Sequence, residues 1–145
     1  MDWIVFTTDS AASPVPPVCP TTATIKATLG GSPAAESSAT EPATSAFDFT
    51  TITCKYGYPS NGDAVMFEST VTASEFSHWY PSALRPKGKL AGLGSAAFWD
   101  KYPVLTKTRE NQVFVFIAPY VITIDSLNAT VAREVALARL LVPTV

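Results

Sequence analysis

The sequence predicts an α+β domain, in which an antiparallel β-sheet of about five strands is packed by two to three helices and held by one disulfide. Three observations favour this fold class. Short β-branched and aromatic runs alternate with tight turn signals, separate segments carry apolar residues at helical spacing, and the chain holds two well-separated cysteines. Its 145 residues are the length of one domain.

Residues 1–18 are expected to form an extended N-terminal arm or linker, and residues 19–145 a single α+β domain. The stretch from Thr7 to Val18 is rich in Ser, Ala, Thr and Pro, a composition typical of linkers. Before it stand the apolar residues that would dock such an arm on a neighbouring protein, namely Trp3, Ile4 and Phe6. The acidic Asp2 does not suit a signal peptide, so we expect any export signal to lie outside this sequence.

A short helix is predicted from residue 21 or 22 to residue 29. Ile25 and Leu29 stand four residues apart on one helical face, and Gly30 is a C-terminal stop. The stretch that follows holds Ala, Ser, Thr, Pro and Glu but almost no large apolar residue. Because such a stretch cannot bury enough surface to fold alone, we expect a flexible loop at 32–45.

The next segments are expected to form a hairpin and a short helix. Phe47–Tyr58 and Ala64–Thr72 have strand composition and flank a turn signal at residues 59–62, which predicts antiparallel pairing. The four residues from Thr72 to Glu75 have the form of a capping box, in which two side chains hydrogen-bond reciprocally to the first turn. They predict a short helix that ends before Pro81.

The C-terminal half is expected to add strands and a final helix. The glycine-rich stretch from Gly92 leads into a strand at Trp99, and Val104–Arg109 pairs with Gln112–Thr123 about a turn at residues 110–111. The second of these two strands is apolar on both faces, which predicts a central position. Pro119 favours a bulge there, or pairing on one side only beyond that point. The last helix is expected to begin at Asp125 or Ser126 and to run to about Leu141.

Charge and hydropathy exclude two kinds of partner. The formal net charge is −2, charged residues make up 15% of the chain, and the ten basic residues are scattered. A nucleic-acid interface needs a concentrated positive face, so no nucleic-acid partner is expected. No apolar run approaches the roughly 18–20 residues that span a bilayer, so no transmembrane segment is expected.

No residue pattern predicts a catalytic centre, a metal or a cofactor. His78 is the single histidine, no Gly-x-Ser-x-Gly elbow is present, and two cysteines with one histidine fall short of four zinc ligands. Glycosidase chemistry needs a carboxylate pair, but no spacing selects one among Asp63, Glu68, Glu75 and Asp100. The glycines at 92 and 94 match part of a dinucleotide fingerprint, yet no buried strand precedes them, and a simple turn is the better interpretation.

Cys19 and Cys54 allow two interpretations. They could be buried free thiols, since free cysteine packs as a small apolar residue. Alternatively, they form a disulfide that closes a loop of about 36 residues and contributes roughly 3–4 kcal/mol on the chain-entropy model. We favour the disulfide, which would place the protein outside the reducing cytosol.

Several aromatic residues cluster around the middle helix and the glycine turn, and they also allow two interpretations. They could belong to the core, or some could line an apolar groove for a lipid, glycan or peptide. The candidate ligand or partner surface consists of Trp79, Tyr80, Trp99 and Tyr102.

Five features recur together in one known family. They are Cys19-Pro20 before a helix ending at Leu29-Gly30, Cys54-Lys55-Tyr56 after a polar loop, the run from Gly92 to Phe98, a hairpin at Glu110-Asn111 before Val113 to Ile117, and an Ala/Leu/Arg-rich final helix. In these features the chain resembles the DUF3558-type envelope proteins of actinobacteria over roughly residues 18–142. The resemblance implies an exported, disulfide-bonded α+β domain of unassigned activity, with no catalytic residues to carry over.

The function expected from the sequence is that of a non-enzymatic, extracytoplasmic domain of the cell envelope that binds a ligand or a protein partner. The alternative is a structural or accessory subunit of a larger cell-surface assembly, which docks through its N-terminal arm. Weakest among the options is an enzyme, which would have to use His78.

Overall fold

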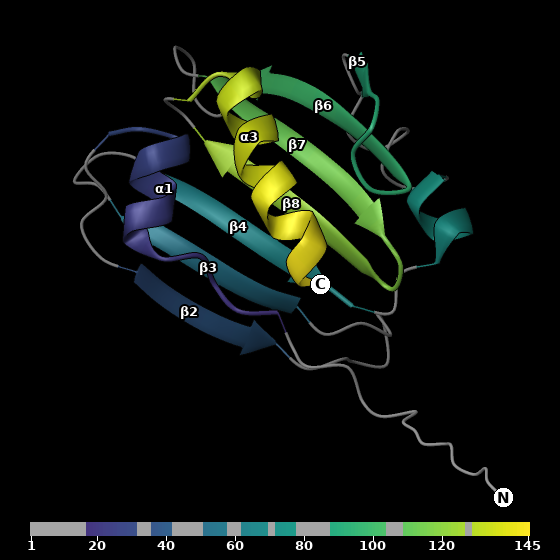
Figure 1. Cartoon of the computed structure of the whole chain (residues 1–145), viewed down its shortest axis with the longest axis horizontal. Helices are drawn as coiled ribbons and strands as arrows, with labels where there is room; N and C mark the ends of the chain where they lie inside the picture. Colours follow the sequence, from purple (N-terminus) through teal and green to yellow (C-terminus); the bar gives the residue numbers. More distant parts are fainter. Residues whose placement is uncertain are drawn as a thin grey trace, which may run out of the picture.

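A computed structural model places seven strands of the chain in one antiparallel sheet, with two helices across one of its faces (Figure 1). The predicted α+β fold class is confirmed. The residues that the structure describes are 17–31, 36–41, 51–57, 62–69, 72–77, 88–103, 109–126 and 129–145.

The strands follow the order β2-β3-β4-β8-β7-β6-β5 across the sheet. Their bounds are β2 (Glu36–Glu41), β3 (Thr51–Gly57), β4 (Gly62–Glu68), β5 (Gly88–Leu90), β6 (Ala96–Pro103), β7 (Arg109–Ile117) and β8 (Tyr120–Ser126). The helices are α1 (Thr22–Thr28), α3 (Val131–Leu141) and the 3-10 turn η2 (Val142–Thr144). Residues 73–77 are also helical.

Two antiparallel meanders make up the sheet. The first is β2-β3-β4 and the second is β5-β6-β7-β8, and they join where β4 pairs with β8 in the register Val65↔Ile124. After β4 the chain therefore crosses to the far edge of the sheet and returns strand by strand to its centre. The helical residues 73–77 lie on this crossing.

Helix α1 forms where the sequence predicts it. Thr21 is its N-cap and accepts a hydrogen bond from the backbone N–H of Thr24 at 3.2 Å. Ile25 and Leu29 are buried on the inner side of the helix, and Gly30 follows with a φ of 85°, a conformation that glycine adopts readily. The predicted hairpin of β3 and β4 is also present, with Cys54 opposite Val65.

The expected loop at 32–45 contains strand β2, which corrects that prediction for residues 36–41. An edge strand needs only one hydrogen-bonded neighbour and no apolar side chain, so a Ser/Thr/Glu-rich stretch can form one. β2 pairs with β3 from Glu36↔Tyr56 to Glu41↔Thr51. With this strand and the three-residue β5 at its two edges, the sheet has seven strands rather than about five.

The predicted turn at residues 110–111 was wrong. Both residues belong to β7, and the chain reverses instead at Ala118-Pro119, whose peptide bond is cis. Proline lacks the backbone N–H that a strand needs for pairing, and it is common in turns. Pro119 therefore lies in the turn after β7 and does not form a bulge within one long strand. Ile117 and Tyr120 pair across this turn.

The last helix begins later than expected. Asp125 and Ser126 belong to β8, and the N-cap of α3 is Thr130, which accepts a hydrogen bond from the backbone N–H of Arg133 at 3.3 Å. The Ser126 hydroxyl accepts one from the backbone N–H of Ala129 at 2.9 Å. Strand alternation therefore continues through residue 126 because its neighbours β4 and β7 extend that far.

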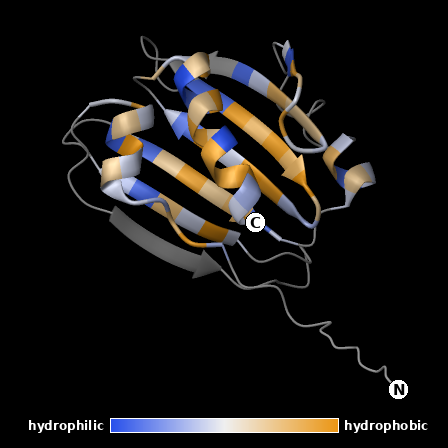
Figure 2. Cartoon of the chain, in the orientation of Figure 1, coloured by the Kyte–Doolittle hydropathy of each residue, from blue (hydrophilic) through white to orange (hydrophobic). Residues whose placement is uncertain are grey.

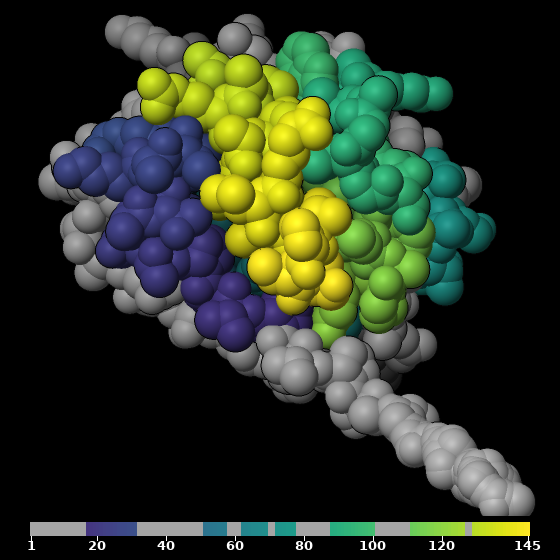
Figure 3. Space-filling model, viewed as in Figure 1, coloured from purple at the N-terminus to yellow at the C-terminus, as the bar shows by residue number. Residues whose placement is uncertain are grey.

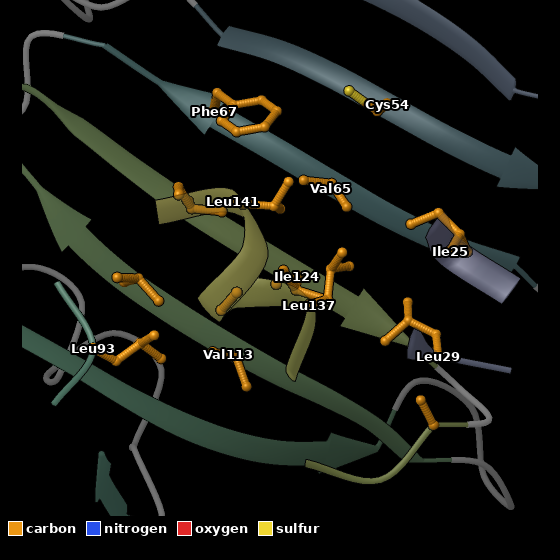
Figure 4. Packing of buried hydrophobic residues seen from close by; sticks show 14 of the residues in the cluster. Ile25, Leu29, Cys54, Val65, Phe67, Leu93, Val113, Ile124, Leu137 and Leu141 are labelled. Atoms are coloured by element: carbon orange, nitrogen blue, oxygen red, sulfur yellow. The ribbon is translucent and has the colours of Figure 1, made fainter. Parts of the chain in front are cut away.

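The main core lies between the sheet and the two helices, on what we call the helix face. Figure 2 shows apolar residues concentrated along β7 and β8, and Figure 3 shows α1 and α3 side by side on this side of the molecule. Leu137 and Leu141 of α3 reach toward the strands, as Figure 4 shows. The buried residues of this core include Ile25, Leu29, Cys54, Tyr56, Val65, Phe67, Val113, Val115, Ile122, Ile124, Leu137 and Leu141.

Candidate functional site

The candidate site lies on the opposite side of the sheet, which we call the second face. Residues alternate between the two faces of a strand, so neighbours of the core residues on β6, β7 and β8 point to this side. Strand register aligns Phe98 with Phe114 and Phe114 with Thr123, in one row across the sheet. The next row aligns Asp100 with Gln112 and Gln112 with Asp125.

One part of the site is an aromatic cluster, formed by Phe76, Phe98, Phe114 and Phe116. All four rings are buried, and they pack with Val121. The ring centroids of Phe98 and Phe114 are 5.1 Å apart, and those of Phe76 lie 5.4 Å from Phe98 and 5.3 Å from Phe116. These spacings are those of favourable aromatic pairs.

Phe76 comes from the helical turn at 73–77, and the predicted capping box holds that turn. The backbone N–H of Thr72 donates to Glu75 Oε1 at 2.9 Å, and the backbone N–H of Glu75 donates to Thr72 Oγ1 at 3.1 Å. The two bonds satisfy donors that the first turn of a helix leaves unpaired. The turn thereby places Phe76 over the rings of the sheet.

Beside the rings lie four polar residues, which we call the polar cluster: Asp100, Gln112 and Asp125 share one row of the register, and Thr123 stands in the neighbouring row opposite Phe114. The exposed fractions of Asp100, Gln112 and Thr123 are only 2%, 6% and 2%. Gln112 Nε2 donates to Asp125 Oδ1 at 2.8 Å. Because a carboxylate accepts hydrogen bonds, this contact fixes which end of the Gln112 amide faces Asp125.

Two oxygen atoms of the polar cluster are buried without a hydrogen-bond partner within the described part of the chain, Gln112 Oε1 and Thr123 Oγ1. Leaving such an atom unsatisfied costs about 1–3 kcal/mol. In folded proteins most buried polar atoms are paired, with protein, with ordered water or with a bound group. Each of the two atoms therefore marks a position where a hydrogen-bonding group from outside this part of the chain would be stabilised.

Two kinds of catalytic centre can be compared with the described residues, a metal site and a carboxylate pair. In the part of the chain that the structure describes, no group of three or more His, Cys, Asp or Glu residues lies close enough to hold a metal ion. Among the carboxylates considered for glycosidase chemistry, Asp63 is opposite Tyr56 on the helix face, whereas Asp100 is on the second face. The sheet separates the two, so they do not form a catalytic pair.

The predicted disulfide between Cys19 and Cys54 is present, with a Cα–Cα distance of 5.7 Å. It attaches the segment before α1 to the middle of β3. The hydroxyl of Tyr56 donates a hydrogen bond to the carbonyl oxygen of Pro20, which adds a second link between the same two segments. The cysteines therefore build the helix face and lie away from the second face.

Of the predicted ligand or partner surface, the structure describes the side chain of Trp99 alone. Trp99 is half-buried and packs against the main core, on the opposite side of β6 from Phe98. Its indole covers Gly88, where a β-carbon would lie 2.6 Å from Trp99 Nε1.

The other predicted residues cannot be placed from this structure. Trp79, Tyr80 and His78 lie outside the described residues, as do Trp3, Ile4 and Phe6 of the proposed docking arm. Tyr102 lies within β6, but its side chain is outside the described part. The expected arm and surface therefore stay predictions.

Sequence reasoning missed the residues of the second face. One signal was available: the strand that begins at Gln112 is apolar on both faces, so a second layer of contacts had to exist. Gln112 and Thr123 stand out as polar residues in apolar runs, at positions that strand alternation aligns with Phe114 and Phe116. That alignment required the turn at Ala118-Pro119, which was not predicted.

Comparison of the chain with family models, with curated proteins and with solved structures finds no match. Within the described residues, no helix is both long and apolar enough to cross a membrane.

Proposed function

We propose that this protein is a non-enzymatic, exported domain of the cell envelope that binds a ligand or a protein partner through the second face of its sheet. The observation that carries the proposal is the pair of buried, unsatisfied oxygens, Gln112 Oε1 and Thr123 Oγ1, beside the aromatic cluster. A few directed polar groups within a mostly apolar lining are typical of binding sites.

Stability alone does not account for this arrangement. Valine has nearly the same shape as threonine, with a methyl group in place of the hydroxyl. If stability were the only requirement, valine at position 123 would therefore give a more stable fold. Gln112 similarly uses one half of its amide on Asp125 and leaves the other half unsatisfied. Polar groups that destabilise a fold and make no compensating structural interaction are characteristic of functional positions.

Two further features support an extracytoplasmic location. The chain contains the Cys19–Cys54 disulfide. Disulfides persist in oxidising compartments and are rare in cytosolic proteins. The resemblance to DUF3558-type envelope proteins of actinobacteria points the same way, and its disulfide and α+β fold agree with the structure.

The proposal is tested by titrating the oxidised full chain with lipid, glycan and peptide fractions of a bacterial envelope, followed by amide NMR. We expect at least one fraction to shift resonances of β6, β7 and β8 selectively. Thr123→Val should weaken that response by about tenfold, the equivalent of one hydrogen bond. Thr53→Val is the matched control, because Thr53 lies on the same face but on β3.

Two outcomes would contradict the proposal. One is the absence of any selective response in β6, β7 and β8 to all the fractions. The other is a hydrolytic activity of the protein that His78→Ala abolishes, since that would make it an enzyme.

A further inference from the structure

We propose that the outer surface of α1 and α3 contacts an anionic lipid surface, so that the second face of the sheet is turned away from the lipid. This contact lies on the opposite side of the molecule from the proposed ligand site and adds a second interaction to it. Three observations support it: the residues that α3 exposes, the charges of both helices, and the charges of the second face.

Helix α3 exposes an apolar stripe, formed by Ala132, Ala136 and Leu140. The three residues follow one another at intervals of four, so they lie along one side of the helix, and all three are exposed. The exposed fraction of Leu140 is 56%. The outward side of a surface helix normally carries polar and charged residues. Core packing does not account for the stripe, because α3 contacts the core through Leu137 and Leu141.

Two exposed arginines border the stripe. At about 3.6 residues per turn, Arg139 lies on one side of it and Arg133 on the other. The stems of such side chains can cover apolar surface while their charged ends stay in water or among headgroups. Apolar area and basic residues together are what binds a helix to an anionic lipid surface. The exposed side of α3 has both.

Helix α1 adds a third positive charge. Lys26 is exposed on α1, which lies beside α3 at the surface (Figure 3). The guanidinium of Arg133 reaches toward the end of α1, since a β-carbon at Gly30 would lie 2.8 Å from Arg133 Nη1. Glu134 is the one acidic residue of the two helices, and it is fully buried. The two helices therefore expose basic side chains and no acidic one.

The second face has a different charge. Strand alternation places Glu68, Asp100 and Asp125 on it, together with Lys55 and Lys89. Among the described residues, acidic side chains thus outnumber basic ones on the sheet side, whereas exposed charges on the helix side are all basic. An anionic surface attracts the helix side more strongly, and this difference orients the molecule.

The composition of the stripe favours lipid over a protein partner. Protein interfaces depend on a few large anchors, mostly aromatic residues and arginines, that fill pockets near the centre of the contact. The centre of this stripe holds two alanines and one leucine, and its arginines lie at the borders. A lipid interface has no fixed shape to match, so a stripe of small apolar residues between basic ones can contact it.

Vesicle binding tests the proposal. The oxidised full chain is sedimented with vesicles of phosphatidylcholine alone, and with vesicles of phosphatidylcholine and phosphatidylglycerol in equal parts. We expect the anionic vesicles to bind about tenfold or more tightly, and added salt to weaken this binding because it screens the charges. Equal binding to both kinds of vesicle, or binding to neither, would overturn the proposal.

Two double variants with the same change of net charge locate the contact. Arg133→Gln with Arg139→Gln should weaken binding to anionic vesicles about 20-fold, because each basic residue near such a surface contributes about fivefold. Lys55→Gln with Lys89→Gln removes two charges from the second face and should change binding by less than about threefold. Equal effects of the two double variants would show that only the net charge matters, and the proposed orientation would then be wrong.

The apolar stripe is tested separately. Leu140→Gln keeps the charge and removes exposed apolar area, so it should weaken binding to anionic vesicles about fivefold. Circular dichroism of each variant confirms that it folds. An unchanged affinity of Leu140→Gln would show that the stripe does not enter the lipid interface.

A measurement on the unmodified protein needs no variant. Amide NMR with anionic bicelles that carry a paramagnetic headgroup should broaden resonances of α1 and α3 more than those of β6, β7 and β8. The opposite pattern would overturn the proposed orientation. If a polyglutamate peptide shifts α3 resonances and bicelles do not, the partner is an acidic protein and the lipid contact is wrong. None of these outcomes affects the proposed function, whose own test is a selective response of β6, β7 and β8.

Discussion

Thr123 differs from valine by one oxygen atom, and that atom lies on the second face with 2% of the residue exposed. At the residue scale, a polar atom without a hydrogen bond lowers stability, whereas an apolar replacement of the same shape does not. Gln112 and Thr123 thus link the stability of the sheet to its proposed binding role. Opposite effects of one substitution on stability and on binding would be diagnostic of a functional position.

We expect Thr123→Val to raise the free energy of unfolding of the unliganded protein by about 1 kcal/mol, because it removes an unsatisfied buried oxygen. Urea denaturation monitored by circular dichroism measures this. Thr53→Val, the control on β3, should change the free energy by less than about 0.5 kcal/mol. A clear loss of stability in Thr123→Val would show that the hydroxyl is satisfied in the native protein.

Gly92 and Gly94 form a second matched pair. Both have positive φ, 69° and 60°, but they differ in the space around them. A β-carbon at Gly94 would lie 2.6 Å from the Phe116 carbonyl oxygen and 2.7 Å from Val115 Cγ1, whereas one at Gly92 would meet nothing within 4 Å. A side chain at position 92 is therefore disfavoured by the backbone conformation alone. A side chain at position 94 is disfavoured both by the backbone conformation and by the atoms packed around it.

Gly92→Ala should cost about 1 kcal/mol of unfolding free energy, the conformational penalty of a left-handed alanine. Gly94→Ala should cost about 2–4 kcal/mol, because the strand it contacts must also shift. Urea denaturation of the two variants gives the difference. Equal costs would mean that the loop moves away from β7 without penalty.

At the scale of elements, local hydrogen bonds determine where a helix begins and ends, whereas the neighbouring strands of the sheet determine where a strand ends. The capping box at Thr72 and Glu75 and the N-cap of α1 form as the local sequence predicts. The predicted start of α3 was wrong by several residues. Ser126 belongs to β8 instead, because it pairs with residues of both β4 and β7. Local signals could not reveal those neighbours.

Helix α3 depends on Thr130, whose hydroxyl accepts from the backbone N–H of Arg133. We expect Thr130→Ala to lower the free energy of unfolding by about 1 kcal/mol, while Thr130→Ser should retain most of the stability because serine caps equally well. Thermal denaturation followed by circular dichroism separates the two. Equal losses in both variants would indicate that packing of the threonine methyl group, and not the cap, matters at this position.

At the scale of the whole molecule, the two meanders meet at β4 and β8, and the disulfide holds the segment before α1 to β3. Cys54 is fully buried on the helix face of β3, so the bond is part of the main core. The disulfide joins residues 35 positions apart in the sequence, and the loop that it closes includes α1 and β2. The bond therefore restricts the unfolded chain over the whole first quarter of the domain.

Replacing both cysteines by alanine should lower the free energy of unfolding by about 3–4 kcal/mol on the chain-entropy model. Urea denaturation of the double variant, compared with the unmodified protein with and without reductant, measures the effect. The reduced protein should behave like the double variant. If reductant leaves the unfolding midpoint unchanged, the bond contributes nothing to stability.

The sequence alone was enough for the fold class, the cysteine pair, α1, the capping box and the β3–β4 hairpin. These features depend on composition or on residues close together in the chain, so local patterns report them. It also predicted a central position for the strand beginning at Gln112, because that strand is apolar on both faces.

Only the tertiary structure decided how β8 joins β4 to β7, that β2 exists, and which residues share the second face. A polar edge strand forms because a neighbour supplies its hydrogen bonds, and no pattern within residues 36–41 reports that neighbour. Gln112 and Thr123 come together through the pairing of β7 with β8, and Asp100 joins them through β6. Which atoms are buried without partners depends on this register, and a shift of one residue would turn every one of these side chains to the other face.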